Sequence, residues 1–178
     1  MPRYFIAILP PTNIKGEIIE IQRELEKEYG AVHAQKTPPH ITVIPPFEIE
    51  EEKMMIFKSA LREYMKKENF PPRTIKLDDF QRFESRTLFI DVAKNTHLEQ
   101  YCKKIKLFFL QQKMIPQRID KHFFVPHITI ANKDLKKREF RLAWEEYKNR
   151  NYKREIELKV LTVLKFNGIK WEVEEEIY

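Results

Sequence analysis

Two copies of one five-residue pattern constrain the fold of this chain more than any other feature. Pro39-His40-Ile41-Thr42-Val43 recurs as Pro126-His127-Ile128-Thr129-Ile130, and the two histidines are 127 − 40 = 87 residues apart in a chain of 178. This interval is close to half the chain, as an internal duplication requires. We therefore expect two similar halves, approximately residues 1–85 and 86–178.

The residues before each copy predict the same succession of elements. Phe5-Ile6-Ala7-Ile8 precedes the first copy and matches Phe89-Ile90-Asp91-Val92 before the second. Both runs have the length and apolar character of buried strands. After each run, apolar residues recur every three or four positions, which is typical of one face of a helix. These residues are Ile14, Ile18, Ile21 and Leu25 in the first half and Leu98, Cys102, Ile105 and Phe109 in the second.

Turn and capping residues predict where elements begin and end. Pro45-Pro46 should end the first histidine strand, and a capping-box spacing over Thr96–Glu99 should begin one helix. A further helix is expected from Asp134. Asn167-Gly168 is the strongest hairpin signal, and the alternating run 156–160 before it predicts a long closing hairpin. The other expected elements are a helix over 50–67 and strands over 74–83, 87–92 and 123–131.

This mixture of helices, strands and hairpins predicts an α+β fold with mostly antiparallel sheets. The duplication adds two lobes, each a sheet with outer helices, around a central cleft. We expect residues 1–178 to form a single bilobal domain whose two halves exchange strands.

Composition narrows the class of protein further. The chain has 33 Lys and Arg against 27 Asp and Glu, a net charge of +6, and 42% hydrophobic residues, which excludes disordered and fibrous classes. No stretch approaches the ~20 apolar residues of a membrane helix, and the first residues lack a signal-peptide layout. We expect a soluble cytoplasmic monomer without a membrane partner. The single cysteine, Cys102, is expected to be a buried hydrophobe.

The repeated motif points to phosphate chemistry. Side chains alternate across a strand, so His40 and Thr42 share one face of their strand, and His127 and Thr129 share one face of theirs. Hydroxyl groups can donate to the non-bridging oxygens of a phosphate, while one neutral and one protonated histidine can act as base and acid. This scheme requires no metal ion and no cofactor. Purely structural histidines would explain one copy of the motif more easily than two.

These residues resemble the 2H phosphoesterases, the LigT-like superfamily of 2′,5′ RNA ligases and cyclic phosphodiesterases, which is defined by two His-x-Thr motifs. The resemblance also covers the opening strand from Arg3 to Pro10 and the mid-chain run Arg86-Thr87-Leu88-Phe89-Ile90. It implies a bilobal fold and metal-independent attack on RNA-type 2′,3′-cyclic phosphates, or formation of 2′–5′ linkages. It also implies that His40 and His127 are the catalytic pair and that Thr42 and Thr129 bind phosphate.

One departure from the family concerns the end of the second motif. Bacterial ligase-like members often continue into an arginine, whereas here Asn132-Lys133 follows Ala131. Lys133 opens a cluster with Lys136, Lys137, Arg138 and Arg141, which could guide an RNA backbone or be an ordinary solvated helix face. Further possible substrate contacts are Phe47, Arg86, Arg118 and Phe124.

Three alternatives remain beside an enzyme that acts on RNA. The same cleft could serve a non-catalytic RNA- or nucleotide-binding module, or the same chemistry could act on a cyclic phosphate that is not RNA. A zinc site drawing on His40, His127, His122 and Cys102 is disfavoured, because the usual ligand spacings are missing. His33 and His122 are expected in surface loops, and His97 on the surface of a helix.

Overall fold

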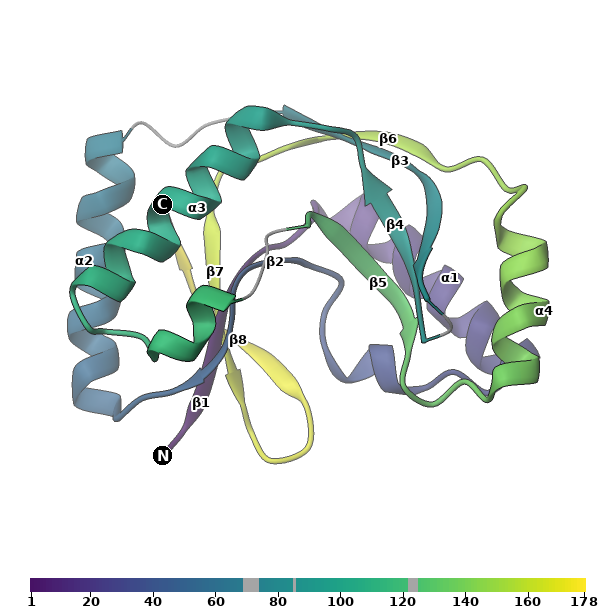
Figure 1. Ribbon diagram of the computed structural model, residues 1–178, viewed down its shortest axis with the longest axis horizontal. Helices are drawn as coiled ribbons and strands as arrows, with labels where there is room; N and C mark the ends of the chain where they lie inside the picture. The colour runs from purple at the N-terminus through teal and green to yellow at the C-terminus, as the bar shows by residue number, and fades with distance from the viewer. Residues whose placement is uncertain (69–73, 85, 122–124) are drawn as a thin grey trace.

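The computed structural model describes residues 1–68, 74–84, 86–121 and 125–178. Its elements form two four-stranded sheets with helices on their outer sides (Figure 1). In chain order they are β1 (Arg3–Ile8), α1 (Thr12–Tyr29), the 3₁₀ turn η1 (His33–Lys36), β2 (Ile41–Glu48), α2 (Glu51–Glu68), β3 (Thr74–Phe83), β4 (Thr87–Val92), α3 (Thr96–Gln111), the 3₁₀ turn η2 (Gln117–Lys121), β5 (His127–Asn132), α4 (Lys137–Tyr147), β6 (Lys153–Glu157), β7 (Leu161–Phe166) and β8 (Trp171–Ile177).

The two sheets are antiparallel throughout and have matching strand orders. One sheet has the order β2-β1-β7-β8 and the other the order β5-β4-β3-β6. We call the first sheet with α2 and α3 lobe A, and the second with α1 and α4 lobe B. The α+β, two-lobed prediction is therefore confirmed. The boundary near residue 85 separates the two copies in the sequence, but it does not separate the two sheets. Strand β3 before it and strand β4 after it pair in the same sheet.

Each half of the chain sends one helix to the opposite lobe. Helix α1 follows β1 of lobe A, yet it packs on β5 and α4 of lobe B. Its Glu24 accepts a hydrogen bond from Arg150 at 2.8 Å, and its Glu17 accepts one from Arg154 at 2.8 Å. Helix α3 follows β4 of lobe B and contacts β2 of lobe A in the same way. The lobes are therefore built from both halves.

The strand register corrects the alignment of the two copies. Ile41 of β2 lies opposite Ile8, and the equivalent Ile128 of β5 lies opposite Ile90. The structural equivalent of Ile8 is therefore Ile90. The sequence alignment paired Ile8 with Val92 and was wrong by two residues. A short apolar run contains several matches of similar quality, so register depends on cross-strand packing.

Pro45-Pro46 do not end the first histidine strand, because β2 continues to Glu48. Strand β2 lies at the edge of its sheet, where a residue without an N–H group is tolerated. A bulge also absorbs the prolines: Tyr4 and Ile6 of β1 lie opposite Phe47 and Ile44, so three steps on β2 face two on β1.

Two helices begin at residues other than those predicted. Helix α3 is capped by Asn95 instead of Thr96, and the Asn95 side chain accepts a hydrogen bond from Leu98 N at 3.0 Å. Helix α4 begins at Lys137 instead of Asp134, because the Asp134 carboxylate accepts hydrogen bonds from Val32 N and His33 N. Capping residues compete for such positions, and the surrounding backbone decides between them.

The closing hairpin is shorter than predicted. Its turn at Asn167-Gly168 is confirmed, with Gly168 at φ 101°, and it joins β7 to β8. The preceding segment is instead divided, because Ile156 of β6 pairs with Ile75 in lobe B before the chain returns to lobe A. A strand's apolar alternation therefore does not identify the sheet that it joins.

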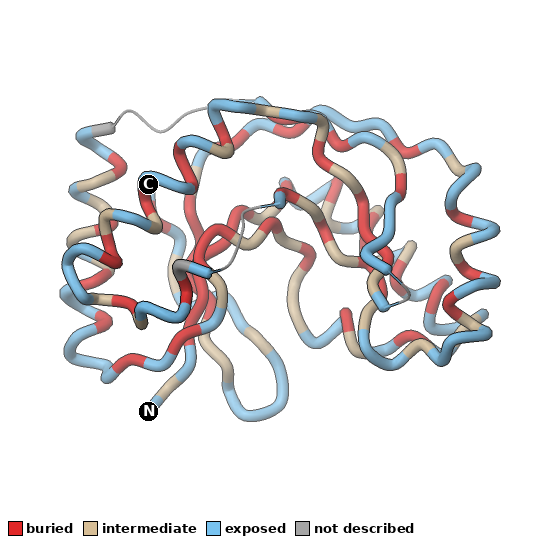
Figure 2. Tube along the Cα trace, viewed as in Figure 1, coloured by how far each residue is buried: buried red, intermediate tan, exposed pale blue. Residues whose placement is uncertain are grey.

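One large apolar core runs through both lobes, and a second, smaller cluster of Phe5, Ala7 and Leu164 is separate from it (Figure 2). The large core includes a stacked pair of α2 and α3 side chains, Phe57 and Phe109, with ring centroids 4.0 Å apart. Cys102 is 1% exposed, as expected for a buried hydrophobe. None of the helices in the described ranges is long and apolar enough to cross a membrane.

We predict that the lobes unfold together. The two tryptophans report on different lobes, Trp144 on α4 and Trp171 on β8, so Trp144→Phe and Trp171→Phe each leave one local fluorophore. Ile18→Ala on the crossing helix α1 should cost about 2–5 kcal/mol and lower the denaturant midpoint equally for both fluorophores. Two separated transitions would contradict this prediction.

Candidate active site

The two histidine motifs lie on the edge strands that meet in the middle of the molecule. Strand β2 is the edge of one sheet and β5 is the edge of the other, and the two strands contact each other (Figure 1). The predicted alternation holds in both, since Ile41, Val43, Ile128 and Ile130 are buried in the core. The histidines and threonines, on the other face, are half-buried.

Each histidine is held by the same backbone contact. Nδ1 of His40 lies 2.8 Å from the carbonyl oxygen of Pro38, and Nδ1 of His127 lies 2.7 Å from that of Val125. A carbonyl oxygen can only accept, so Nδ1 carries the proton in both rings. The neutral form therefore keeps its lone pair on Nε2, which is the nitrogen available to a substrate.

Aromatic rings support both imidazoles. Phe5 of β1 lies 4.9 Å from the His40 ring, and Phe89 of β4 lies 5.1 Å from the His127 ring. A second aromatic residue packs on each of these phenylalanines: Trp171 on Phe5 and Phe83 on Phe89. Such apolar walls restrict the rotation of each ring and remove water from it.

Burial lowers the pKa of both histidines. The pKa of His40 falls from its ordinary 6.5 to about 4, mainly through loss of solvation, and the nearby charge of His127 lowers it further. Burial also lowers the pKa of His127, but the charge of Asp91 opposes that effect. Asp91 lies directly across from His127 in the β4–β5 pair. The two motifs therefore differ in their electrostatic surroundings.

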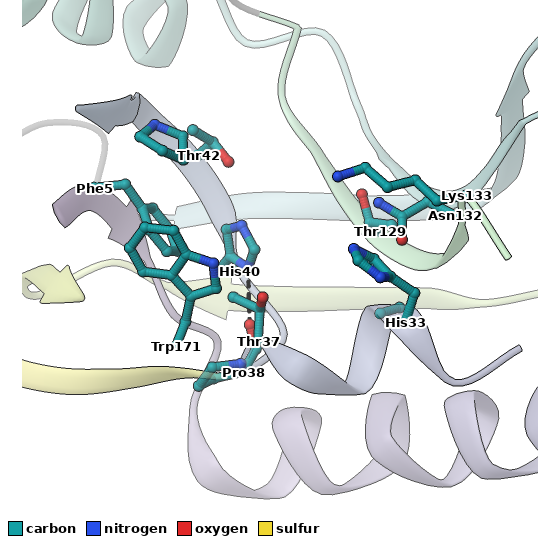
Figure 3. Close-up of a pocket in the computed structure, with 12 residues that line it drawn as sticks. Phe5, His33, Thr37, Pro38, His40, Thr42, Thr129, Asn132, Lys133 and Trp171 are labelled. Atoms are coloured by element: carbon teal, nitrogen blue, oxygen red, sulfur yellow. Dashed lines mark hydrogen bonds between the residues drawn. The ribbon is translucent and has the colours of Figure 1, made fainter. Parts of the chain in front are cut away.

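A cavity of about 240 Å³ lies between the lobes and contains the predicted phosphate-binding groups. His40 and Thr42 reach it from lobe A, and Thr129 reaches it from lobe B (Figure 3). Phe5 and Trp171 form an aromatic wall on the side of lobe A, while Asn132 and Lys133 lie on the opposite side near His33. The cavity thus has one apolar wall and one polar, cationic wall.

A strained turn places Lys133 in this cavity. Asp134 N donates to Asn132 O at 2.8 Å across Lys133, which has φ 65°. This is the γ-turn with positive central φ, the rarer and more strained of the two γ-turn forms. Three hydrogen bonds hold it: Lys133 N donates to Arg86 O, and the Asp134 carboxylate accepts from Val32 N at 2.8 Å and from His33 N at 2.6 Å. The structure therefore keeps a lysine where glycine or asparagine would be less strained.

Of the other predicted substrate contacts, only Lys133 lines the cavity. Phe47 is 1% exposed and packs against Phe57 in the core. Arg86 and Arg118 are exposed and lie outside the cavity. Phe124, like His122, falls outside the described residues.

Several site residues were not foreseen from the sequence. Trp171 and Phe5 reach the cavity from β8 and β1, and no local pattern indicates that these strands flank it. His33 was expected in a surface loop, but η1 packs against β5 and brings it to the cavity. Gln22 is 2% exposed, and its amide donates to Thr129 O at 3.3 Å. In the sequence, Gln22 lies on the same helix face as the buried Ile18 and Leu25. A polar side chain at such a position indicates a buried hydrogen bond, and this was the signal available for the contact.

The zinc alternative gains no support from the described ranges, where no three His, Cys, Asp or Glu side chains form a group able to hold a metal ion. Cys102 lies in the core on α3 instead of at the cleft.

Each of the two antiparallel lobes carries one His-x-Thr motif on its inner edge strand, and His40, Thr42 and Thr129 line the cavity between the lobes, whereas His127 is not among its lining residues. Such a pair of motifs is typical of the 2H phosphoesterase class. The chain belongs to the 2′-5′ RNA ligase superfamily, whose sequence model matches residues 10–169. Two relatives, each named "Putative phosphoesterase", come from Geobacillus kaustophilus and Halalkalibacterium halodurans. The first is 29% identical over 82% of this chain and 78% of the relative, and the second is 31% identical over 72% and 68%.

Solved structures share the fold. Escherichia coli LigT complexed with 3′-AMP has a TM-score of 0.64 at 17% identity, covering 100% of this chain and 97% of LigT. The MHV ns2 PDE domain has a TM-score of 0.58 at 15% identity, covering 94% of this chain and 100% of that domain. At these identities the likeness concerns the fold alone.

We predict that His40 titrates near pH 4 in the folded protein, where burial opposes its charged form. The unfolded chain binds this proton at a pKa of about 6.5, so stability is full above that pH and declines as the pH falls toward the folded-state value. NMR titration of the imidazole protons, with the His40→Asn variant used for assignment, measures the value. A His40 pKa of 6.5 or higher would contradict the prediction.

We also predict that Lys133→Gly stabilises the protein by about 1 kcal/mol relative to Lys133→Ala. Both variants remove the cationic side chain, but only glycine removes the Cβ that makes φ 65° unfavourable. Denaturant unfolding of the pair isolates the backbone strain. Equal stability would show that the turn is unstrained.

Proposed function

We propose that the protein is a metal-independent phosphoesterase that acts on RNA-type 2′,3′-cyclic phosphates or 2′–5′ phosphodiester linkages, with His40 and His127 as its acid–base pair. The observation that carries the proposal is the pair of anchored imidazoles, each with Nδ1 on a backbone carbonyl, which makes Nε2 the basic nitrogen of the neutral ring. Membership of the 2′-5′ RNA ligase superfamily supports the substrate class, and LigT was crystallised with the nucleotides 3′-AMP and NADP⁺.

The proposed hydrolysis uses one proton transfer at each histidine. The base takes a proton from water as the water oxygen bonds to phosphorus, and the acid donates a proton to the ribose oxygen whose bond to phosphorus breaks. Thr42 and Thr129 donate hydrogen bonds to the non-bridging oxygens, where negative charge increases. In the ligation direction, a ribose hydroxyl takes the place of water.

We assign the acid role to His127 and the base role to His40. Asp91, opposite His127, favours the protonated imidazole, whereas no carboxylate among the described residues counteracts the effect of burial on the His40 pKa. A protonated His127 also disfavours protonation of His40 through their mutual repulsion. The pair therefore favours a single proton, which this reaction requires.

The location and assembly of the protein remain predictions from the sequence. We propose that it works in the cytoplasm as a monomer.

We predict that His40→Ala and His127→Ala each lower kcat on a 2′,3′-cyclic nucleotide by about 10²–10⁴-fold, since each removes one proton transfer. His97→Ala, on the exposed surface of α3, is the matched control and should retain full activity. Excess chelator should leave the wild-type rate unchanged. Loss of activity on chelation would contradict the metal-independent mechanism, and full activity in both site variants would overturn the assignment. Nucleotide binding without turnover would favour a non-catalytic module.

The pH profile tests the assignment of roles. Burial lowers the pKa of both histidines below 6.5, so the form with protonated His127 and neutral His40 is most populated below that pH. We predict a bell-shaped kcat/KM with its maximum below pH 6.5 and a decline toward pH 8 as His127 loses its proton. Asp91→Asn should move this alkaline limb to lower pH, and an unmoved limb would show that Asp91 does not set the His127 pKa.

A further inference from the structure

Seven basic residues gather at one end of lobe B, beside the cavity. They come from three segments: the end of β3 with the turn into β4, the loop after β5, and the start of α4. We call them the lobe B rim, and they are Arg82, Arg86, Lys133, Lys136, Lys137, Arg138 and Arg141.

Contacts between the segments bring these residues together. Arg82, Lys137, Arg138 and Arg141 line one hollow of about 400 Å³. Arg82 lies 5.1 Å over the ring of Trp144 on α4, which joins β3 to the helix. Strands β4 and β5 pair as far as Thr87 opposite Asn132, so Arg86 and Lys133 follow at the same end. The rim is therefore one surface and not a run of charge along the sequence.

The charge of this surface is not neutralised locally. Within the described residues, no ion pair links any rim residue to a carboxylate. The acidic residues of the same segments are Glu84, Asp134 and Glu139, and Asp134 is engaged by backbone groups of η1. The charge just after the other end of α4 is neutralised, since Arg150 forms ion pairs with Glu24 and Glu146. The positive field is thus concentrated on the rim.

The start of α4 also places its cations against the helix dipole. Lys136 is the N-cap residue without a side-chain capping bond, and Lys137 and Arg138 follow in the first turn, where Glu139 is the one acidic residue. The N-terminus of a helix carries partial positive charge, so folding alone would favour acidic residues there. A local preference that is broken beside a functional site indicates a requirement other than stability.

Lys133 connects the rim to the candidate active site, because it lines the cavity and also belongs to the rim. A chain of phosphates that has its end in the cavity would meet the other rim residues on leaving it. Lysine and arginine without acidic partners bind nucleic-acid backbones through their phosphates, independently of base sequence. The exposed ring of Phe83 lies 4.9 Å from His127 and adds a surface on which a base can stack.

We propose that the lobe B rim is a docking surface for the backbone of an RNA strand whose terminal phosphate occupies the cavity. The preferred substrate is then an oligonucleotide end and not a free cyclic mononucleotide. This inference rests on the proposed function for the chemistry at the cavity, but the rim binds phosphates whichever histidine acts as acid.

The test uses the triple variant Lys137→Glu, Arg138→Glu, Arg141→Glu in the full chain. None of these residues lines the cavity, and acidic residues favour the first turn of a helix, so α4 should remain folded with an unchanged or higher Tm. The matched control reverses the same number of charges at Lys94, Lys103 and Lys104, which are exposed and lie beyond the opposite end of β4 or on α3.

The substrates are a 2′,3′-cyclic mononucleotide and a short RNA oligonucleotide ending in the same cyclic phosphate. We expect the triple variant to lose about tenfold or more in kcat/KM on the oligonucleotide and to remain within about twofold of wild type on the mononucleotide. The salt dependence for the oligonucleotide should also weaken, by about 0.7 in logarithmic slope for each phosphate contact removed. The control variant should match wild type on both substrates.

The outcomes separate the rim from the catalytic proposal. If the triple variant and the control lose equal kcat/KM on the oligonucleotide, or if neither loses any, the proposed RNA-docking role of the rim is wrong. Hydrolysis of the mononucleotide by wild type would still support the proposed function. If wild type hydrolyses neither substrate, the proposed function fails, and fluorescence anisotropy with the same RNA still tests the rim through binding. Binding to anionic vesicles that the triple variant loses, without any change toward RNA, would assign the surface to a membrane and overturn the proposal.

Discussion

The contact between the edge strands β2 and β5 is the constraint on which the site depends. Neither sheet can form a two-histidine site alone, because each supplies one imidazole and one hydroxyl. The crossing helices hold the edges in place, since α1 packs on β5 and α3 packs on β2. The Gln22 amide of α1 reaches the backbone of Thr129 itself. The same elements that bury the core therefore set the spacing of the cleft.

The duplication provides symmetric chemistry, and single residues then break the symmetry. Both imidazoles are anchored through Nδ1 and supported by phenylalanine, which makes their Nε2 atoms equivalent. Asp91 changes the charge near one of them. The walls of the cavity also differ, with Trp171 on one side and Lys133 on the other. An acid–base pair benefits from such differences, because the acid must be protonated while the base is neutral. Two histidines with identical pKa values would have no preference for which ring carries the proton.

Much of the fold could be predicted because periodic apolar patterns report local structure directly. The strands at 74–83 and 87–92 and the buried stripe of α3 lie where the sequence predicts them. The errors concern competition between local signals and tertiary contacts. Pro45-Pro46 are accommodated at a sheet edge, Asp134 caps η1 instead of α4, and β6 joins the sheet of lobe B. In each case the deciding partner is distant in the sequence.

The sequence by itself determined the α+β class and predicted the four site residues His40, Thr42, His127 and Thr129, because a repeated motif and a two-residue alternation are visible in one dimension. Only the tertiary structure decided what surrounds those residues. It brought Trp171, Phe5 and His33 to the cavity, withdrew Phe47 into the core, and joined Arg82 and Arg86 to the basic start of α4. These placements depend on strand order and helix crossing, and no local pattern encodes the packing of segments far apart in the chain.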